Sequence, residues 1–154
     1  MRKLVLALVL PLLMTGGAQG QAVCPALAAS NVEVKAATAS PELEPARLML
    51  GQAANVTLHP GDDLRLVIAP EKKSAAGSFG GMLVVDVREA GTYQVTLSGN
   101  AWIDLVRDGA VVASGAHGHD GGCKMVSFGL TPGRHVIQLS GNKEDSIKVM
   151  VSRK

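Results

Sequence analysis

Apolar and polar residues alternate in short runs through most of the chain. The clearest run holds Tyr93, Val95 and Leu97, separated by glutamine and threonine. A period of two is typical of a β-strand that buries one face, because successive side chains point to opposite sides. Similar runs fill the sequence from Leu48 to the C-terminus. Their shared-face residues are Val56 and Leu58; Leu64, Leu66 and Ile68; Leu83, Val85 and Val87; Val126, Phe128 and Leu130; His135, Ile137 and Leu139; and Ile147, Val149 and Val151.

Turn residues separate these runs at short intervals. Asp108-Gly109 lies between two apolar runs and indicates a β-hairpin. Thr131-Pro132-Gly133 favours a type II turn. The sequence therefore predicts an all-β domain, an antiparallel β-sandwich of about nine strands.

The N-terminus has the composition of a signal peptide. A basic start is followed by an apolar run from Leu4 to Met14 and by small residues before a cut after Gly20; a cut after Ala22 fits nearly as well. The run is too short to cross a bilayer, which takes roughly 20 apolar residues, so we expect no membrane span. We assign residues 1–20 to the signal peptide, residues 21–47 to an irregular arm that is extended or partly disordered, and residues 48–154 to the sandwich. The protein is expected in the periplasm or the medium.

Removing the leader changes the charge balance. The chain has 15 basic and 13 acidic residues, but Arg2 and Lys3 lie in the leader, so 13 of each remain. No cluster of lysine and arginine with interleaved aromatic residues occurs. We therefore expect no nucleic-acid partner.

The mature chain has two cysteines, Cys24 and Cys123. We expect them to form a disulfide, because an exported protein meets an oxidising compartment. The alternative is lipid attachment to Cys24. Gln21-Ala22-Val23 argues against it, because a lipoprotein signal has an aliphatic residue three positions before the cysteine and a small residue directly before it.

Three segments resemble the pre-peptidase C-terminal (PPC) modules of bacteria, namely residues 91–99, 103–109 and 130–141. The resemblance covers roughly residues 79–152 and consists of turns and alternation. It implies a jelly-roll-like, non-catalytic β-sandwich of the kind appended to exported hydrolases, where some members contact carbohydrate or calcium.

The segment Ala101–Leu105, with His117, His119 and Cys123, also resembles small secreted proteins of alphaproteobacteria, some of which are labelled homogentisate dioxygenase. The chain is far shorter than that enzyme and has no matching His/Glu iron motif. We therefore do not adopt the label.

The segment from residue 114 to residue 123 collects side chains that bind transition metals: His117, His119, Asp120 and Cys123. In an extended segment both imidazoles of His-x-His point to the same side, so they could supply two of the ligands of a metal site. The other interpretation, which we favour, is a flexible loop that faces water. Its four glycines make a preorganised site costly in chain entropy, and a disulfide would remove Cys123 as a ligand.

Trp102 and Asp104 alternate with Ile103 and Leu105. If the isoleucine and leucine face the core, Trp102 and Asp104 lie outside, where they can stack a sugar or dock a partner. The alternative, which we favour, is a structural role in which Trp102 covers the N-terminal arm or lies in the core.

Motifs for nucleophilic or zinc-dependent hydrolysis, such as GxSxG and HExxH, do not occur. We expect a non-catalytic, monomeric exported protein without a cofactor, which binds an envelope protein or a glycan through loops and the Trp102 region. The alternative is a metal-binding protein or a small, dioxygenase-like metalloenzyme that holds a transition metal ion with His117, His119 and Asp120.

Overall fold

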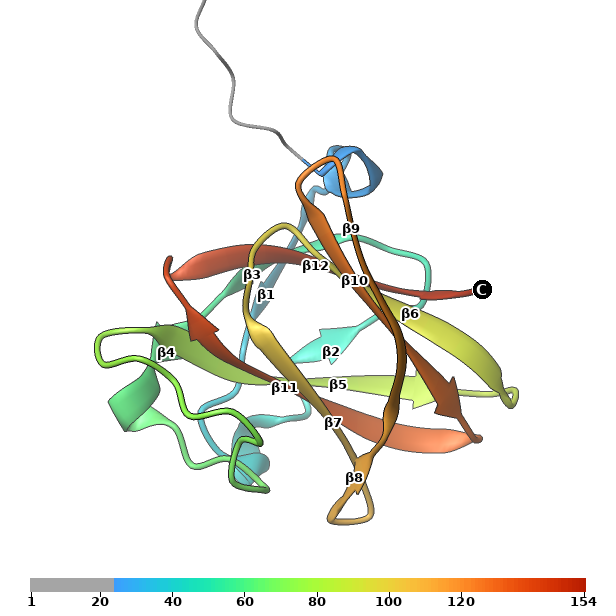
Figure 1. Ribbon diagram of the computed structural model, residues 1–154. Helices are drawn as coiled ribbons and strands as arrows, with labels where there is room; N and C mark the ends of the chain where they lie inside the picture. The colour runs from blue at the N-terminus through green and yellow to red at the C-terminus, as the bar shows by residue number, and fades with distance from the viewer. Residues whose placement is uncertain (1–23) are drawn as a thin grey trace, which may run out of the picture.

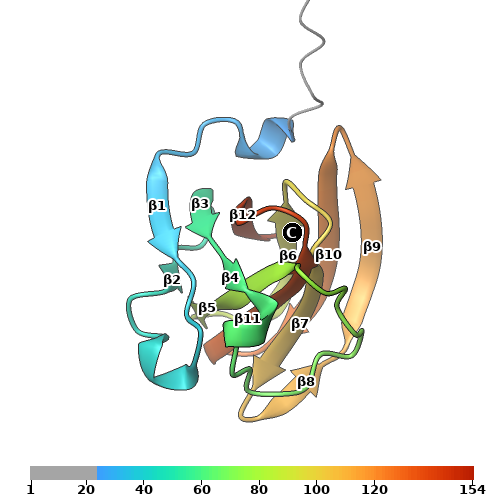
Figure 2. The same ribbon diagram turned by 90° about the vertical axis from the view of Figure 1, so that its left-hand side faces the viewer.

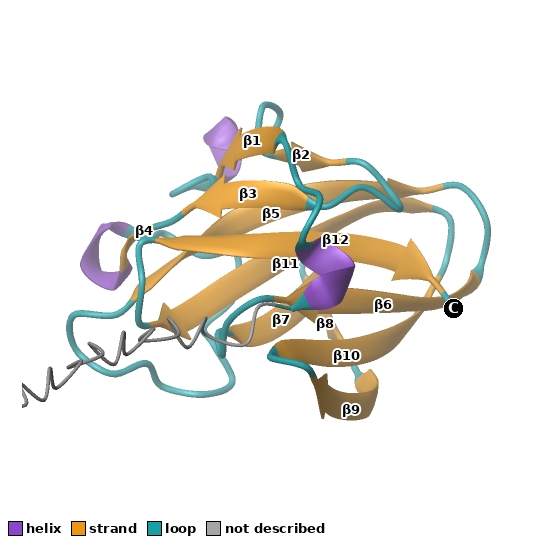
Figure 3. Ribbon diagram, turned by 90° about the horizontal axis from the view of Figure 1, so that it is seen from above, coloured by secondary structure: helices purple, strands orange, loops and turns teal. Residues whose placement is uncertain are grey.

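The computed structural model describes residues 24–154, so the predicted signal peptide at residues 1–20 lies outside the described part. The described residues form two six-stranded sheets, mostly antiparallel and packed as a sandwich (Figures 1 and 3), which confirms the predicted fold class. In spatial order, sheet A comprises β1 (Val32–Lys35), β3 (Ala54–Thr57), β12 (Ser146–Arg153), β6 (Gly91–Leu97), β10 (Cys123–Leu130) and β9 (Ser114–Asp120). Sheet B comprises β2 (Arg47–Leu48), β5 (Phe79–Val87), β11 (Gly133–Asn142), β7 (Trp102–Arg107) and β8 (Ala110–Val112), with β4 (His59–Pro60) paired to β5.

Helical structure in the described part is limited to three short 3₁₀ helices. They are η1 (Pro25–Leu27), η2 (Ser40–Glu42) and η3 (Gly61–Asp63). Within residues 24–154, no helix has the length and apolar character needed to cross a membrane.

The core lies between the sheets, where the inner faces of both meet. Val95 and Phe128 of sheet A and Ile137 and Leu139 of sheet B are all buried there. Burying a large apolar side chain stabilises the fold by about 1.5–3 kcal/mol, so these faces dominate the stability. Every apolar face predicted from the alternation is buried, except the one at residues 64–68.

The segment expected to be an N-terminal arm supplies strands to both sheets. β1 pairs in parallel with β3, and β2 pairs in parallel with β5. Between them, Ala37 exchanges two backbone hydrogen bonds with Met82, at 2.8 and 2.9 Å. A Cβ at Gly81 would lie 2.5 Å from the Cβ of Ala36, so the close approach depends on small side chains. Backbone hydrogen bonds thus attach this segment, which also contains η1 and η2, to the sandwich.

The connection from η3 to β5, residues 64–78, covers the outer face of sheet B (Figure 2). The alternation at residues 64–68 predicts a strand, but none forms in this connection. Its backbone is bound instead by the buried side chain of Gln138. Oε1 of Gln138 accepts hydrogen bonds from the amides of Val67 and Ile68 at 2.8 and 3.1 Å, and Nε2 donates to the carbonyl of Ile68 at 3.2 Å. Since one side chain satisfies these groups, the segment packs on the sheet without joining it.

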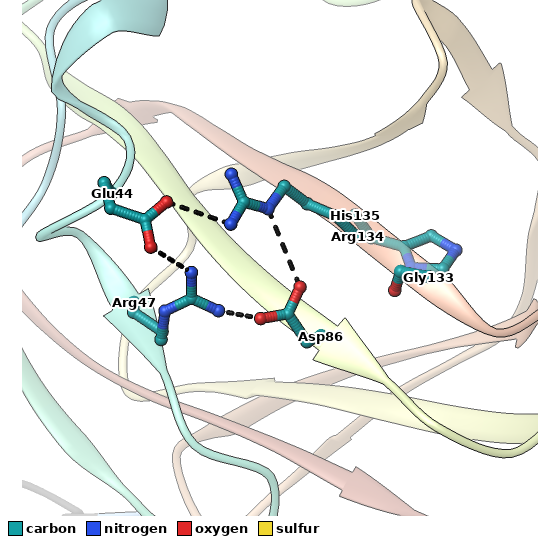
Figure 4. A network of polar contacts seen from close by, with 6 residues as sticks. All are labelled: Glu44, Arg47, Asp86, Gly133, Arg134 and His135. Atoms are coloured by element: carbon teal, nitrogen blue, oxygen red, sulfur yellow. Dashed lines mark hydrogen bonds and ion pairs between the residues drawn. The ribbon is translucent and has the colours of Figure 1, made fainter.

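A ring of charged side chains holds β2 against β5 and β11 (Figure 4). Glu44 accepts hydrogen bonds from Arg47 at 2.6 Å and from Arg134 at 2.9 Å. Asp86 pairs with the same two guanidinium groups. The hydrogen bond from Arg47 is the main cause that lowers the pKa of Glu44. The ring fixes the position of the N-terminal segment at the surface, where water screens each pair.

The predicted disulfide between Cys24 and Cys123 is present. It joins the residue before η1 to the first residue of β10, across 99 positions of sequence. Leu27 is fully buried beside it and packs with Met125 and Met150. A second, smaller apolar cluster thus surrounds the bond.

His135 is buried in the core on β11. Its Nδ1 donates to the carbonyl of Gly133 at 3.1 Å, so Nε2 is the acceptor that faces the Arg107 guanidinium at 3.5 Å. Burial is the main cause that lowers the pKa of His135, and the charge of Arg107 lowers it further, while the bond to Gly133 and the charge of Asp108 oppose the shift. The folded protein therefore favours the neutral imidazole.

We expect the domain to lose stability as the pH falls below about 6.5, the ordinary pKa of histidine in an unfolded chain. Below that pH the unfolded chain binds a proton that the folded core disfavours, so the free energy of unfolding decreases. Urea unfolding at about pH 7.5 and about pH 5.5 measures the loss. His135→Gln should reduce this pH dependence, whereas His119→Gln, at an exposed position, should keep it. Equal pH dependence in wild type and His135→Gln would contradict the assignment.

Candidate functional site

The stretch expected to be a flexible loop is mostly an edge strand. Residues 114–120 form β9, which pairs with β10. Gly121 and Gly122 make the turn between them with φ angles of +53° and +83°, which glycine adopts without strain. Ser127 Oγ also accepts a hydrogen bond from the amide of Ala116 at 2.8 Å. The glycine-rich sequence therefore builds a tight hairpin.

The residues considered as metal ligands do not converge. His117 and His119 share one side of β9, as the His-x-His pattern predicts, whereas Asp120 follows His119 directly and points to the other side. His117 Nε2 lies 3.0 Å from Ser114 Oγ, and Cys123 belongs to the disulfide. Nowhere in residues 24–154 do three or more His, Cys, Asp or Glu side chains gather in a way that could hold a metal ion.

Trp102 and Asp104 lie on the outer face of sheet B, because Ile103 and Leu105 beside them face the core. Trp102 is half-buried, and its Nε1 donates to Asp104 Oδ1 at 3.1 Å. Asp104 is buried, and its Oδ2 accepts a longer hydrogen bond from the amide of Glu71 at 3.4 Å. The carboxylate therefore holds the indole and the covering segment in one arrangement.

Two lysines approach the indole of Trp102. The Nζ of Lys124 lies 5.6 Å from the ring centre, and that of Lys72 lies 5.8 Å from it. Both distances allow a cation–π attraction. Lys124 also donates to the carbonyl of Ala101 at 2.7 Å. Burial is the main cause that lowers the pKa of Lys124, and the charge of Lys72 lowers it further.

Two hollows share Trp102 and Lys124 in their walls. The first, of about 570 Å³, lies where β7, β8, β9 and β10 meet, and its apolar wall includes Val112 and Phe128. The second, of about 730 Å³, is lined by strand and loop residues and is more polar, with Asn100 among the loop residues. His117 lines the first hollow and His119 the second. Together the hollows form a concave surface with an aromatic residue at the junction.

Sequence reasoning singled out Trp102 and Asp104 but missed the lysines around them. Lys72, Lys124 and Lys143 are far apart in the sequence, and only the folded chain brings them to one hollow. The one local signal is the pair Lys72-Lys73 in a polar, glycine-rich stretch. Such a pair is usually a solvated loop and predicts no site by itself.

This chain has a likeness among solved structures but none among protein families or curated proteins. No protein-family model and no curated protein matches the chain. Among solved structures, the pre-peptidase C-terminal domain of a collagenase from Bacillus anthracis matches with a TM-score of 0.46 and 13% sequence identity. The match covers 68% of this chain and 91% of that one. The likeness to this PPC domain concerns the fold alone.

Proposed function

We propose that this protein is a non-catalytic binding module that acts outside the cytoplasm and recognises a glycan at the two hollows beside Trp102. The observation that carries the proposal is the half-buried indole, which Asp104 holds at the junction of both hollows. Binding sites are typically concave, with aromatic and apolar walls and a few oriented polar groups. This surface has each of these properties.

A sugar ring suits such a surface because it has an apolar C–H face and a rim of hydroxyls. The C–H face packs against an indole, which offers a large and rigid apolar area. The hydroxyls can bond to polar side chains of the second hollow, such as Asn100 and His119. Since the hollows meet at Trp102 and Lys124, a chain of several sugars can extend from one into the other.

The disulfide supports a place outside the cytoplasm. Disulfides form and persist in oxidising compartments and are rare in the cytosol. The buried bond between Cys24 and Cys123 therefore fits a periplasmic or secreted protein.

The side chains near the hollows support binding rather than chemistry. Ser114 and His117 are hydrogen-bonded, but no carboxylate among residues 24–154 bonds to His117 to orient its ring. A serine–histidine pair acts as a nucleophile when a third group holds the imidazole. The pair therefore serves better as a polar rim of the first hollow.

The single tryptophan provides a direct test. Titration with a panel of neutral and acidic polysaccharides (dextran, polygalacturonate and dextran sulfate) should change the fluorescence of Trp102. Trp102→Ala should weaken the binding by about tenfold or more, measured by affinity gel electrophoresis, because a central aromatic contact is removed. Trp102→Phe should keep part of the affinity.

Met49→Ala is the matched control, because Met49 is 61% exposed and lines neither hollow. It should bind as the wild type does. Thermal unfolding of each variant separates a loss of contact from a loss of fold. If no polysaccharide of the panel binds, or if Trp102→Ala and Met49→Ala bind alike, the glycan proposal fails.

A further inference from the structure

We infer that the glycan is acidic and that four lysines around the second hollow bind its anionic groups. These residues, here called the lysine cluster, are Lys72, Lys73, Lys124 and Lys143. The inference rests on the proposed function and specifies its ligand. It comes from the distribution of charge, from the absence of carboxylate partners among residues 24–154 and from the position of the charges around the indole.

Positive charge is concentrated at the second hollow. Residues 24–154 contain seven lysines: Lys35, Lys72, Lys73, Lys124, Lys143, Lys148 and Lys154. Four of them line this hollow, together with a single acidic residue, Glu144. Beyond the predicted leader the sequence has equal numbers of basic and acidic residues. The cluster is therefore a local feature of the folded surface, and not a result of a basic composition.

The lysine cluster has no carboxylate partners within the described chain. Every salt bridge among residues 24–154 joins an arginine to a carboxylate, and the ring of Arg47 and Arg134 with Glu44 and Asp86 is an example. No lysine of the cluster lies within 4.0 Å of an acidic oxygen. Four ammonium groups beside the single carboxylate of Glu144 raise the local potential, which attracts an anion to a concave site.

The positions of Lys72 and Lys124 show where an anionic group would lie. Both ammonium groups lie within 6 Å of the centre of the Trp102 ring, so a sugar on this indole carries its substituents close to both. The two charges also repel each other, which contributes to the lowered pKa of Lys124. A carboxylate or sulfate between them would offset this repulsion. It would also bond to the Lys124 ammonium group in place of the water that burial excludes.

The cluster is held by separate parts of the fold. Lys124 belongs to β10, where its side chain is fixed by the hydrogen bond to Ala101. Lys72 and Lys73 belong to the segment that Gln138 binds to sheet B. The charge of Lys124 is thus positioned before a ligand arrives, which reduces the entropy lost on binding.

The test compares three polymers at the same ionic strength: polygalacturonate, dextran sulfate and neutral dextran. The wild type should bind at least one acidic polymer about tenfold or more tightly than dextran. Raising NaCl from about 0.01 M to about 0.15 M, which shortens the screening length from about 30 Å to about 8 Å, should weaken this binding strongly. Polygalacturonate and dextran sulfate distinguish a carboxylated ligand from a sulfated one.

The double variant Lys72→Gln/Lys124→Gln should bind the acidic polymers about 5- to 10-fold more weakly, because two charge contacts are lost. Its weak binding of dextran should fall by a smaller factor, and Lys72→Arg/Lys124→Arg should keep the tighter binding of the acidic polymers. The control is Lys35→Gln/Lys154→Gln, which removes the same charge at positions that line neither hollow.

Equal affinity of the wild type for dextran and the acidic polymers would overturn the inference while leaving the glycan proposal intact. An equal loss in the control and in the cluster variant would also overturn it, since only net charge would then matter. If none of the three polymers binds, the proposed function itself fails, and the inference fails with it.

Discussion

Replacing both Cys24 and Cys123 by alanine should lower the free energy of unfolding by about 4–5 kcal/mol, the largest effect expected of any change considered for this protein. The bond spans 99 positions, and a cross-link over a loop of that length strongly restricts the unfolded chain in the chain-entropy model. Both cysteines are buried, so alanine avoids placing a new polar group in the apolar cluster around Leu27. Urea unfolding of the double variant and the oxidised wild type measures the difference.

Reduction of the wild type under denaturing conditions, followed by refolding with the thiols kept reduced, provides the control. The reduced wild type should unfold at nearly the same urea concentration as the double variant. Circular dichroism should show the β structure of the variant below its transition, because the main core between the sheets does not include the disulfide. If the oxidised and reduced wild types unfold at the same urea concentration, the bond does not contribute the stability assigned to it.

Replacing Gln138 by alanine should cost about 2–3 kcal/mol, because a buried side chain that satisfies three backbone groups is removed. The amides of Val67 and Ile68 and the carbonyl of Ile68 lose their partner. The segment 64–78 then loses the side-chain bonds that attach it to sheet B. We therefore expect trypsin to cut after Lys72 and Lys73 faster in this variant than in the wild type.

Gln94→Ala is the matched control for this prediction. Gln94 also lies on a strand, but its side chain donates a single hydrogen bond, to Thr96 Oγ1 at 3.3 Å. Its replacement should change the free energy of unfolding by about 0.5 kcal/mol or less. The loss of Gln138 should also weaken the binding of acidic polymers, because it frees the segment that carries Lys72 and Lys73. Equal stability and equal trypsin resistance of the Gln138→Ala and Gln94→Ala variants would show that Gln138 does not anchor the segment.

The alternation in the sequence predicts most of the sandwich because a strand with one buried face has apolar residues at every second position. Tyr93, Val95 and Leu97 lie on one side of β6 and are buried, as a period of two requires. The disulfide is predictable for a similar reason: two cysteines in a chain with a signal-like leader have one intramolecular pairing.

The same alternation misleads at residues 64–68. A period of two shows which residues share a face, but the partner strand that would supply the hydrogen bonds is not visible in it. Here the backbone is bound by the side chain of Gln138, and the segment forms no strand. At residues 114–120 the reverse occurs: exposed histidine and glycine carry no apolar period, yet pairing with β10 makes them a strand.

The sequence by itself determined the two-sheet core, the faces of its strands and the pairing of Cys24 with Cys123, because each depends on local periodicity or on residue type. Only the tertiary structure decided that residues 32–35 and 47–48 join the sheets, that Gln138 holds the covering segment, and that lysines from distant parts of the chain surround Trp102. The physical reason is that these features depend on contacts between residues far apart in the chain. The residues next to Lys124 or Gln138 in the sequence do not indicate which group the polar side chain contacts in the folded protein.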